Sequence, residues 1–350
     1  MLVVLLAILG TFRTVHHVDF QIDTSAGVNE SFYMEVGGLE QFVQIRGQDV
    51  SNPVIIAVHG GPANPLPMLA FRTQDQLEEY FTIVHWDQRG SGRTYFKNRN
   101  IEQPDPSLET ILQDMDEVVD YARERFGQEQ VIVKGQSWGT IVSTHYVQRH
   151  PEKVSAFVAV SPVVNMAEGA GLVAGKALAN AEEANSSDAE ELRSLLENLQ
   201  ATTEYNSQLF RDYYRLQVLT FRHLPNENNR GIPQIAWACA TSPTINLTDL
   251  RWFMTMANVN RFESLQNQIL HDAFAFDARN HAPHFEVPVY ILVGDQDWIT
   301  PVELTQLYFA HIEAPTKELT VLPNVGHSPF LEVPDQYQAA ILNFLQGSDD

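Results

Sequence analysis

The stretch Gly135-Gln136-Ser137-Trp138-Gly139 decides the fold of this chain. It follows the β-branched run Val131-Ile132-Val133, which predicts a strand, and it leads into residues 140–146, which read as a helix. Ser137 therefore occupies a sharp strand-to-helix turn of the kind called a nucleophile elbow. Side chains at the two glycine positions would collide with the neighbouring strand and helix. A serine between two glycines also occurs in plain turns, so the interpretation depends on partners elsewhere in the chain.

The composition limits the kinds of partner that the protein can have. With 350 residues, 44% of them hydrophobic and 19% charged, the chain can bury a large core as one unit with room for an insertion. A formal charge of −22 argues against nucleic acid or an anionic membrane as a partner. Cys239 is the only cysteine, which excludes an intramolecular disulfide and a multi-cysteine metal site. We expect Cys239 to be a small buried hydrophobe.

The amino end, residues 1–30, is an apolar segment followed by a linker. The run from Met1 to Gly10 is apolar throughout, yet it is shorter than the roughly 20 residues that cross a bilayer. It fits the tail of a longer anchor, an uncleaved export signal, or a helix that packs on the protein or on a second subunit. The sequence therefore predicts membrane contact or self-association here. It leaves the compartment open, with the cytoplasm favoured over membrane association or export.

Alternating and continuous apolar runs predict a mostly parallel, doubly wound sheet of about eight strands. Two alternating runs flank Gly37-Gly38 and predict an antiparallel hairpin. Residues 53–58 form a continuous apolar run, as expected of a central strand buried on both faces, and they end in His59-Gly60-Gly61-Pro62. The glycines there leave backbone N–H groups uncovered, as an oxyanion hole requires. Further strands are expected at residues 81–86, 131–133, 154–160, 287–293 and 319–322.

Between the strands at residues 154–160 and 287–293 the alternation stops. Residues 164–284 carry helical patterns over 167–199, 205–224 and 247–270 without a credible central strand. A helical block inserted in a doubly wound sheet covers the carboxyl ends of the strands, where such sheets bind ligands. We therefore expect a helical cap at 164–284 on a catalytic domain of residues 31–163 and 285–350. Among its aromatic residues, Trp252 and Phe253 are candidates for lining a substrate pocket.

An aspartate and a histidine complete the pattern around Ser137. Asp297 follows the strand at 287–293, and His327 follows the last strand. The order Ser, Asp, His is the one expected of an α/β hydrolase, so the sequence predicts that fold and a catalytic triad. Asp295 also follows the strand, but the usual spacing of a glycine, two residues, the aspartate and a proline four further on favours Asp297.

Four motifs together resemble those of the proline iminopeptidases and their serine-peptidase relatives: His59-Gly60-Gly61-Pro62, residues 87–92 (Asp-Gln-Arg-Gly-Ser-Gly), the elbow, and Gly326-His327-Ser328. The resemblance covers residues 30–163 and 285–347. It implies that Ser137 is the nucleophile, Asp297 the acid and His327 the base. It also implies that Gly61 and Trp138 supply the N–H groups that bind the oxyanion.

Two departures from that family bear on the substrate. Iminopeptidases usually continue Gly-Gly-Pro with another glycine, whereas this chain has Ala63. Their caps present acidic residues, commonly beside tryptophans, that hold the free amino group of the substrate. No matching motif occurs here, and Glu204 is the candidate that the sequence offers.

The residues thus predict a serine hydrolase that works through an acyl-enzyme, without a metal or organic cofactor, on a small molecule or short peptide. The resemblance favours release of an N-terminal residue, proline first. A carboxylesterase for small apolar acyl groups is the alternative, because it needs no amine anchor. A binding protein that keeps the hydrolase fold without turnover is a more remote alternative.

Overall fold

The computed structural model describes residues 2–101, 106–202, 204–224 and 232–347, and for residues 2–8 and 232 it describes the backbone alone. The strands over these ranges are β1 (Val28–Val36), β2 (Leu39–Gly47), β3 (Val54–Val58), β4 (Thr82–Trp86), β5 (Val131–Gln136), β6 (Val154–Val160), β7 (Val289–Gly294) and β8 (Lys317–Leu322). They form one sheet in the order β1-β2-β4-β3-β5-β6-β7-β8. Only β1 with β2 and β2 with β4 pair antiparallel. The predicted hydrolase fold with a mostly parallel sheet is confirmed.

Strand β3 shows why the sheet is covered on both faces. Val54, Ile56 and Val58 pack into one apolar cluster, whereas Ile55 and Ala57 pack into a second cluster on the other face. Alternate residues of a strand point to opposite faces, so a continuous apolar run needs helices on both sides. The strands from β3 to β8 run parallel and turn their carboxyl ends toward one edge of the sheet, which the loops after β3, β5, β7 and β8 follow.

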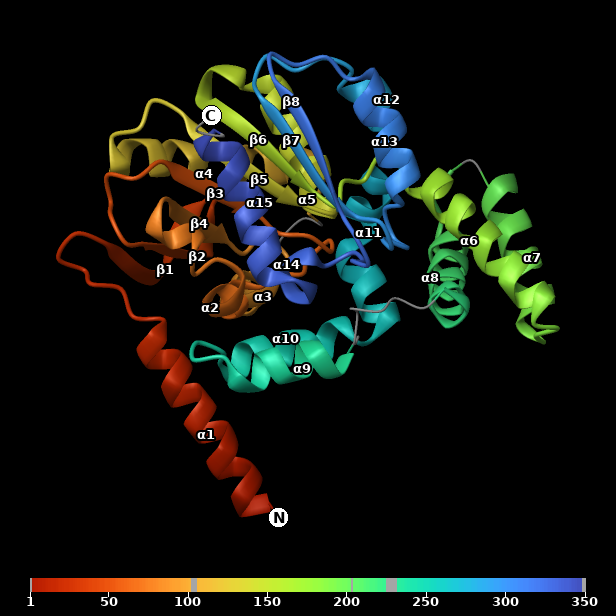
Figure 1. Ribbon diagram of the computed structural model, residues 1–350, viewed down its shortest axis with the longest axis horizontal. Coiled ribbons are helices and arrows are strands. Elements are labelled where there is room, and N and C mark those ends of the chain that lie inside the picture. The colour runs from red at the N-terminus through yellow and green to blue at the C-terminus, as the bar shows by residue number, and fades with distance from the viewer. Residues whose placement is uncertain (1, 102–105, 203, 225–231, 348–350) are drawn as a thin grey trace.

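Helices flank the sheet and fill the interval between β6 and β7. Those packed around the sheet are α2 (Ala70–Thr73), α3 (Gly92–Asn98), α4 (Leu108–Phe126), α5 (Trp138–Arg149), α12 (Ala278–His281), α13 (Val302–His311), α14 (Pro329–Glu332) and α15 (Pro334–Gln346). Those between β6 and α12 are α6 (Met166–Glu183), α7 (Asp188–Ala201), α8 (Ser207–His223), α9 (Ile232–Thr241), α10 (Leu247–Met256) and α11 (Val259–Ala275). Figure 1 shows α6, α7 and α8 together on one side of the molecule, away from α9 and α10.

The helices between β6 and α12 differ from the expected runs in three places. The run expected over residues 167–199 is two helices, because Asn185 takes a left-handed φ of 52° and ends the first of them. The run over 247–270 is also two helices, since the side chain of Asn258 caps the start of α11. Helix α9 was not expected from the sequence pattern. The division of the chain into a catalytic domain and a cap of residues 164–284 stays our interpretation.

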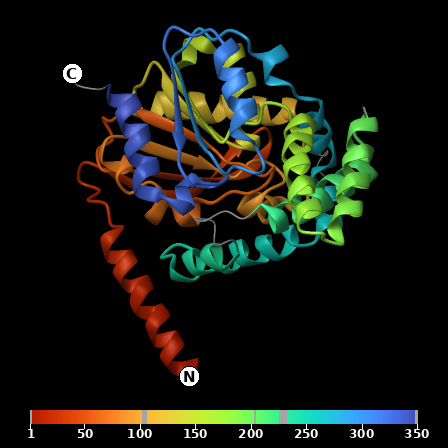
Figure 2. The ribbon, with the colours of Figure 1, turned by 45° about the vertical axis from the view of Figure 1, so that its right-hand side comes forward.

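The amino end is a helix, α1 (Leu2–Asp19), which projects from the body beside α9 and α10 (Figures 1 and 2). The side chains of residues 1–8, the core of the predicted apolar run, lie outside the described part. Where α1 meets the body, the Nδ1 atom of His16 lies 2.9 Å from the carbonyl oxygen of Thr241. Of the helices that the structure describes, none is long and apolar enough to span a membrane.

Candidate active site

The turn after β5 holds Ser137 in a conformation that few side chains adopt. Its φ and ψ are 49° and −122°. A Cβ atom at Gly135 would lie 2.6 Å from the carbonyl oxygen of Gly139, and one at Gly139 would collide with the carbonyl oxygen of Val58. Both glycines therefore allow β3, β5 and α5 to approach closely enough for the turn to close. The serine side chain is left at the carboxyl edge of the sheet, at the start of α5.

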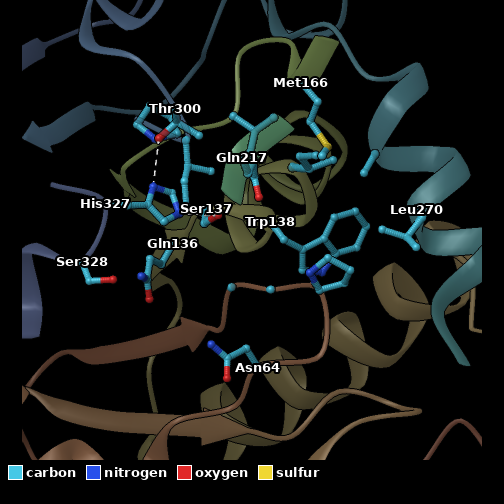
Figure 3. A pocket seen from close by; sticks show the side chains of 18 of the residues that line it. Asn64, Gln136, Ser137, Trp138, Met166, Gln217, Leu270, Thr300, His327 and Ser328 are labelled. Carbon is cyan, nitrogen blue, oxygen red and sulfur yellow. Dashed lines mark hydrogen bonds between the residues drawn. The ribbon is translucent and has the colours of Figure 1, made fainter. Parts of the chain in front are cut away.

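Ser137, His327 and Asp297 form a continuous hydrogen-bonded chain. The Oγ atom of Ser137 lies 2.9 Å from Nε2 of His327, and Nδ1 of His327 lies 2.9 Å from Oδ2 of Asp297. An ionised carboxylate only accepts hydrogen bonds, so Nδ1 carries the ring proton and Nε2 is free to accept from the serine hydroxyl. Figure 3 shows the His327 ring between Ser137 and Thr300 at the wall of a cavity.

The carboxylate of Asp297 is fully buried and has several donors. It accepts hydrogen bonds from the backbone N–H groups of Ile299 (2.9 Å) and Thr300 (2.8 Å) and from the Thr300 hydroxyl (2.7 Å). Burial alone would raise the pKa of Asp297, but His327 and these hydrogen bonds outweigh it and hold this pKa below its usual value. Asp297 therefore stays ionised beside His327, in the state that orients the imidazole.

The loop that carries His327 is held by Glu332, a residue that the sequence reading did not single out. One carboxylate oxygen of Glu332 accepts from the backbone N–H of Gly326 (2.7 Å), and the other accepts from that of Ser328 (3.2 Å). Burial raises the pKa of Glu332 above its usual value, although these two hydrogen bonds oppose the shift. Glu332 thus accepts hydrogen bonds from the backbone on both sides of His327 and fixes the position of this loop. The sequence signal was an acid five residues after the histidine.

Gly61 and Trp138 line the cavity together with Ser137. Gly61 has a φ of 118°, which favours glycine, and a Cβ atom at Gly60 would lie 3.3 Å from Cβ of Ser137. Trp138 is the first residue of α5, where a helix leaves N–H groups without partners. Within the described ranges, neither the Gly61 N–H nor the Trp138 N–H donates a hydrogen bond inside the protein. Both are therefore free to bind an oxyanion.

A buried histidine links the glycine loop to the loop after β4. The ring of His59 donates from Nδ1 to the carbonyl oxygen of Gly60 (2.9 Å) and accepts at Nε2 from the backbone N–H of Gln88 (3.3 Å). Burial lowers the pKa of His59 to about 4, so the ring is neutral and its tautomer is fixed. The side chain of Gln88 accepts in turn from Nε1 of Trp138 at 3.2 Å. Hydrogen bonds thus connect the loop after β3, the loop after β4 and the turn that carries Ser137.

Ser137 and His327 open onto a cavity of about 480 Å³ between the sheet edge and the inserted helices. Its walls are mostly apolar and include Leu66, Leu69, Ile141, Val163, Met166, Phe210, Ile235, Phe253, Met256, Phe262 and Leu270. The polar side chains at its surface include Asn64, Asn165, Tyr213, Tyr214 and Gln217. Among the lining residues that the structure describes, there is no aspartate, glutamate, lysine or arginine. The described walls therefore offer no fixed charge to a substrate.

The structure separates the three residues predicted to bind substrate. Phe253 lines the cavity. Trp252 is buried away from it, and its indole Nε1–H donates to the carbonyl oxygen of Ala63 at 2.8 Å. Glu204 is exposed to solvent and is not among the residues that line the cavity. An amine anchor at Glu204 therefore has no support from this arrangement.

The described part of the chain holds no group of three or more histidine, cysteine, aspartate or glutamate side chains placed to bind a metal ion. Cys239 is buried, and burial raises the pKa of its thiol to about 11. Its side chain therefore packs as a neutral thiol in the apolar cluster on one face of the sheet.

Comparison with known proteins agrees with this fold. The model of the α/β hydrolase fold family matches residues 53–334. A probable aminopeptidase of Bacillus subtilis is 27% identical over 304 residues, which cover 87% of this chain and 92% of that protein. A proline iminopeptidase of Pestalotiopsis fici is 21% identical over 90% of this chain and 99% of its own. The crystal structure of the Mycobacterium smegmatis proline iminopeptidase superposes with a TM-score of 0.63 at 20% identity, covering 91% of this chain and 98% of that one.

Proposed function

Because this chain belongs to the α/β hydrolase fold family, we propose that it is a serine hydrolase whose nucleophile is Ser137, activated by His327 and Asp297. The observation that carries the proposal is the unbroken chain of hydrogen bonds from the serine hydroxyl to the buried carboxylate. Two of its relatives are named as peptidases. A peptide bond joins an acyl group to an amine, so cleaving it is also an acyl transfer. The enzyme therefore transfers an acyl group from its substrate to Ser137 and then to water.

Each step of this reaction has a group in place. Nε2 of His327 takes the hydroxyl proton as Oγ of Ser137 attacks the carbonyl carbon, and the Asp297 carboxylate stabilises the imidazolium that forms. The N–H groups of Gly61 and Trp138 bind the negative oxygen of the tetrahedral intermediate. The imidazolium then protonates the leaving group as the carbon–leaving-group bond breaks. Water, deprotonated by Nε2 of His327, attacks the acyl carbon; the bond from that carbon to Oγ of Ser137 then breaks, and the imidazolium returns the proton to Oγ as the acid leaves.

The cavity favours an uncharged, apolar acyl group, which is the substrate of the carboxylesterase alternative. Its described walls hold no carboxylate that could pair with an ammonium group. Burying an unpaired cation in such a site costs several kcal/mol, whereas an alkyl group gains about 0.8 kcal/mol for each CH₂ that it buries. Hydrolysis of small apolar esters is therefore the activity that the cavity fits best.

Release of an N-terminal residue, proline first, is the second candidate. It is favoured by the names of the relatives, which match this chain over most of its length, including the inserted helices. For this candidate to bind a substrate without a paired carboxylate, the substrate amine would have to enter in its neutral form. Its turnover would then rise with pH as the amine loses its proton.

The two candidates are separated by a panel of chromogenic substrates. We expect hydrolysis of p-nitrophenyl butyrate, and we expect N-acetylprolyl amide to be cleaved at least as fast as free prolyl amide at pH 7. Cleavage of free prolyl amide with none of the acetylated form would instead establish an aminopeptidase. No turnover of any ester or amide would contradict both.

A further inference from the structure

Three helices form an exposed apolar surface beside the cavity. On α1, Phe12 and Val15 are 41% and 47% exposed, and on α9 Trp237 is 44% exposed. On α10, Leu250 and Met254 are 46% and 76% exposed. We propose that this surface, called the apolar face below, docks the protein on a phospholipid bilayer.

The three helices lie next to one another. The rings of Phe12 and Trp237 meet edge to face with their centroids 5.4 Å apart, so α1 packs on α9. The side chain of Arg13 reaches the carbonyl oxygen of Ile245, just before α10. In both ribbon views α1 leaves the body next to α9 and α10 and continues beyond them (Figures 1 and 2).

The exposed side of α10 is mainly apolar, with Arg251 as its one exposed charged side chain. Leu247, Leu250 and Met254 recur at the spacing of one helix face. Asp249 and Trp252 are buried on the other side, where they bind Arg93 and the Ala63 carbonyl. Helix α10 therefore buries Asp249 and Trp252 against the rest of the protein and exposes Leu247, Leu250 and Met254 to solvent.

The distribution of charge distinguishes the apolar face from the rest of the protein. The chain as a whole carries a formal charge of −22, which an anionic or neutral membrane would not attract. Residues 2–12 and the helix α9 contain no charged side chain. On α10 the charge of Asp249 is paired with Arg93 inside the protein, which leaves the exposed Arg251, a cation, as the remaining charged side chain of that helix. This side of an otherwise acidic molecule thus has little charge to oppose contact with lipid.

The sequence of α1 favours lipid over a second copy of the protein. From Leu2 to Leu9 every residue is apolar, so this part of the helix has no polar side. A helix that packs on another protein keeps a polar side toward water, whereas hydrocarbon solvates all sides of an apolar helix. At about 1.5 Å per residue these eight residues span about 12 Å, which is within the depth of one leaflet.

Helix α9 connects the cavity with the apolar face. Ile235 of α9 lines the cavity and is also 40% exposed. An apolar substrate dissolved in the membrane could therefore reach the cavity along α9. This last step rests on the proposed function, whereas docking on the bilayer does not.

The test compares binding to phosphatidylcholine vesicles by co-sedimentation. We expect the full chain to bind and the double variant Leu250→Asp, Met254→Asp to bind at least ten-fold more weakly, with unchanged hydrolysis of a soluble ester. The matched control is Leu172→Asp, Leu307→Asp, which adds the same charge at two exposed leucines on α6 and α13. It should bind vesicles as the wild type does.

The proposal is overturned if the wild type does not bind vesicles, or if the control variant loses binding as much as the double variant. A dimer that light scattering detects in the wild type, and that the double variant lacks, would assign the apolar face to self-association if vesicle binding is absent. Loss of ester hydrolysis with intact vesicle binding would count against the proposed function alone.

Discussion

The indole N–H of Trp252 donates a 2.8 Å hydrogen bond to the carbonyl oxygen of Ala63. Ala63 has a φ of 59°, an uncommon conformation for alanine, and it lies two residues after Gly61. Helix α10 is tied to the same region by the buried pair of Arg93 and Asp249. A helix inserted far along the chain therefore supports the loop that carries one of the proposed oxyanion donors.

Replacing Trp252 with phenylalanine should remove this support while keeping most of the ring. One lost hydrogen bond to a buried carbonyl is worth about 1–3 kcal/mol, so kcat should fall about ten-fold, and KM should change little. Affinity for a boronic acid that mimics the tetrahedral intermediate should fall in parallel with kcat. Trp237→Phe, at an exposed tryptophan on α9, is the control and should leave kcat unchanged. Equal losses in both variants would refute a specific effect of Trp252.

The choice between the two aspartates after β7 predicts a large difference between two similar variants. Asp297→Asn should lower kcat by about 10⁴-fold, because an amide leaves His327 in the wrong tautomer. Asp295 is half-buried, and within the described part of the chain its Oδ1 atom has no hydrogen-bond partner. Asp295→Asn should therefore cost less than about ten-fold. The reverse ranking in steady-state kinetics would move the acid to Asp295.

Glu332 should act on catalysis through the position of His327. Glu332→Gln keeps the size of the side chain. One of the two carboxylate oxygens, which accept from the Gly326 and Ser328 N–H groups, becomes an NH₂ group that cannot accept. We expect kcat to fall about ten-fold, in line with the loss of one charge-assisted hydrogen bond. Since burial raises the pKa of Glu332, its protonation in the wild type contributes to the loss of activity on the acid side. The pH profile of the variant should lack this contribution, and an unchanged profile would argue for a structural effect alone.

Asp87 should make stability depend on pH. Burial raises its pKa to about 7, so between its ordinary value of 3.8 and pH 7 the folded protein holds a proton that the unfolded chain has lost. The free energy of unfolding therefore falls as pH rises through this window, by up to about 1.4 kcal/mol per pH unit, and levels off above it. Asp87→Asn should remove this slope, so Tm measured from pH 4 to pH 8 should fall less in the variant. Parallel Tm curves would contradict the shifted pKa.

The sequence could predict those features that depend on the ends of strands. Ser137, Asp297 and His327 each follow a strand, and parallel strands bring such residues to one edge of a sheet. The structure brings their side chains into hydrogen-bond contact, and their catalytic roles are the proposal made above. The eight strands could also be predicted from the sequence. An alternating apolar run indicates a strand buried on one face, and a continuous apolar run indicates a strand buried on both faces.

The parts that the sequence did not predict depend on three-dimensional packing. Trp252 and Phe253 are neighbours in one helix and both are aromatic. The sequence alone therefore does not show which of the two side chains faces the cavity. Helix α9 is ten residues long, has a proline near its start and carries no charge, so it has neither the length nor the polar face that marks a surface helix.

The central claim is that Ser137 forms a covalent acyl-enzyme, and labelling with a fluorophosphonate tests it most directly. Intact-mass and peptide mass spectrometry should find a single adduct on Ser137 in the wild type. The variant Ser137→Ala should carry no adduct and should lose about 10⁴-fold or more in kcat. An adduct on another serine, together with activity retained in Ser137→Ala, would contradict the account.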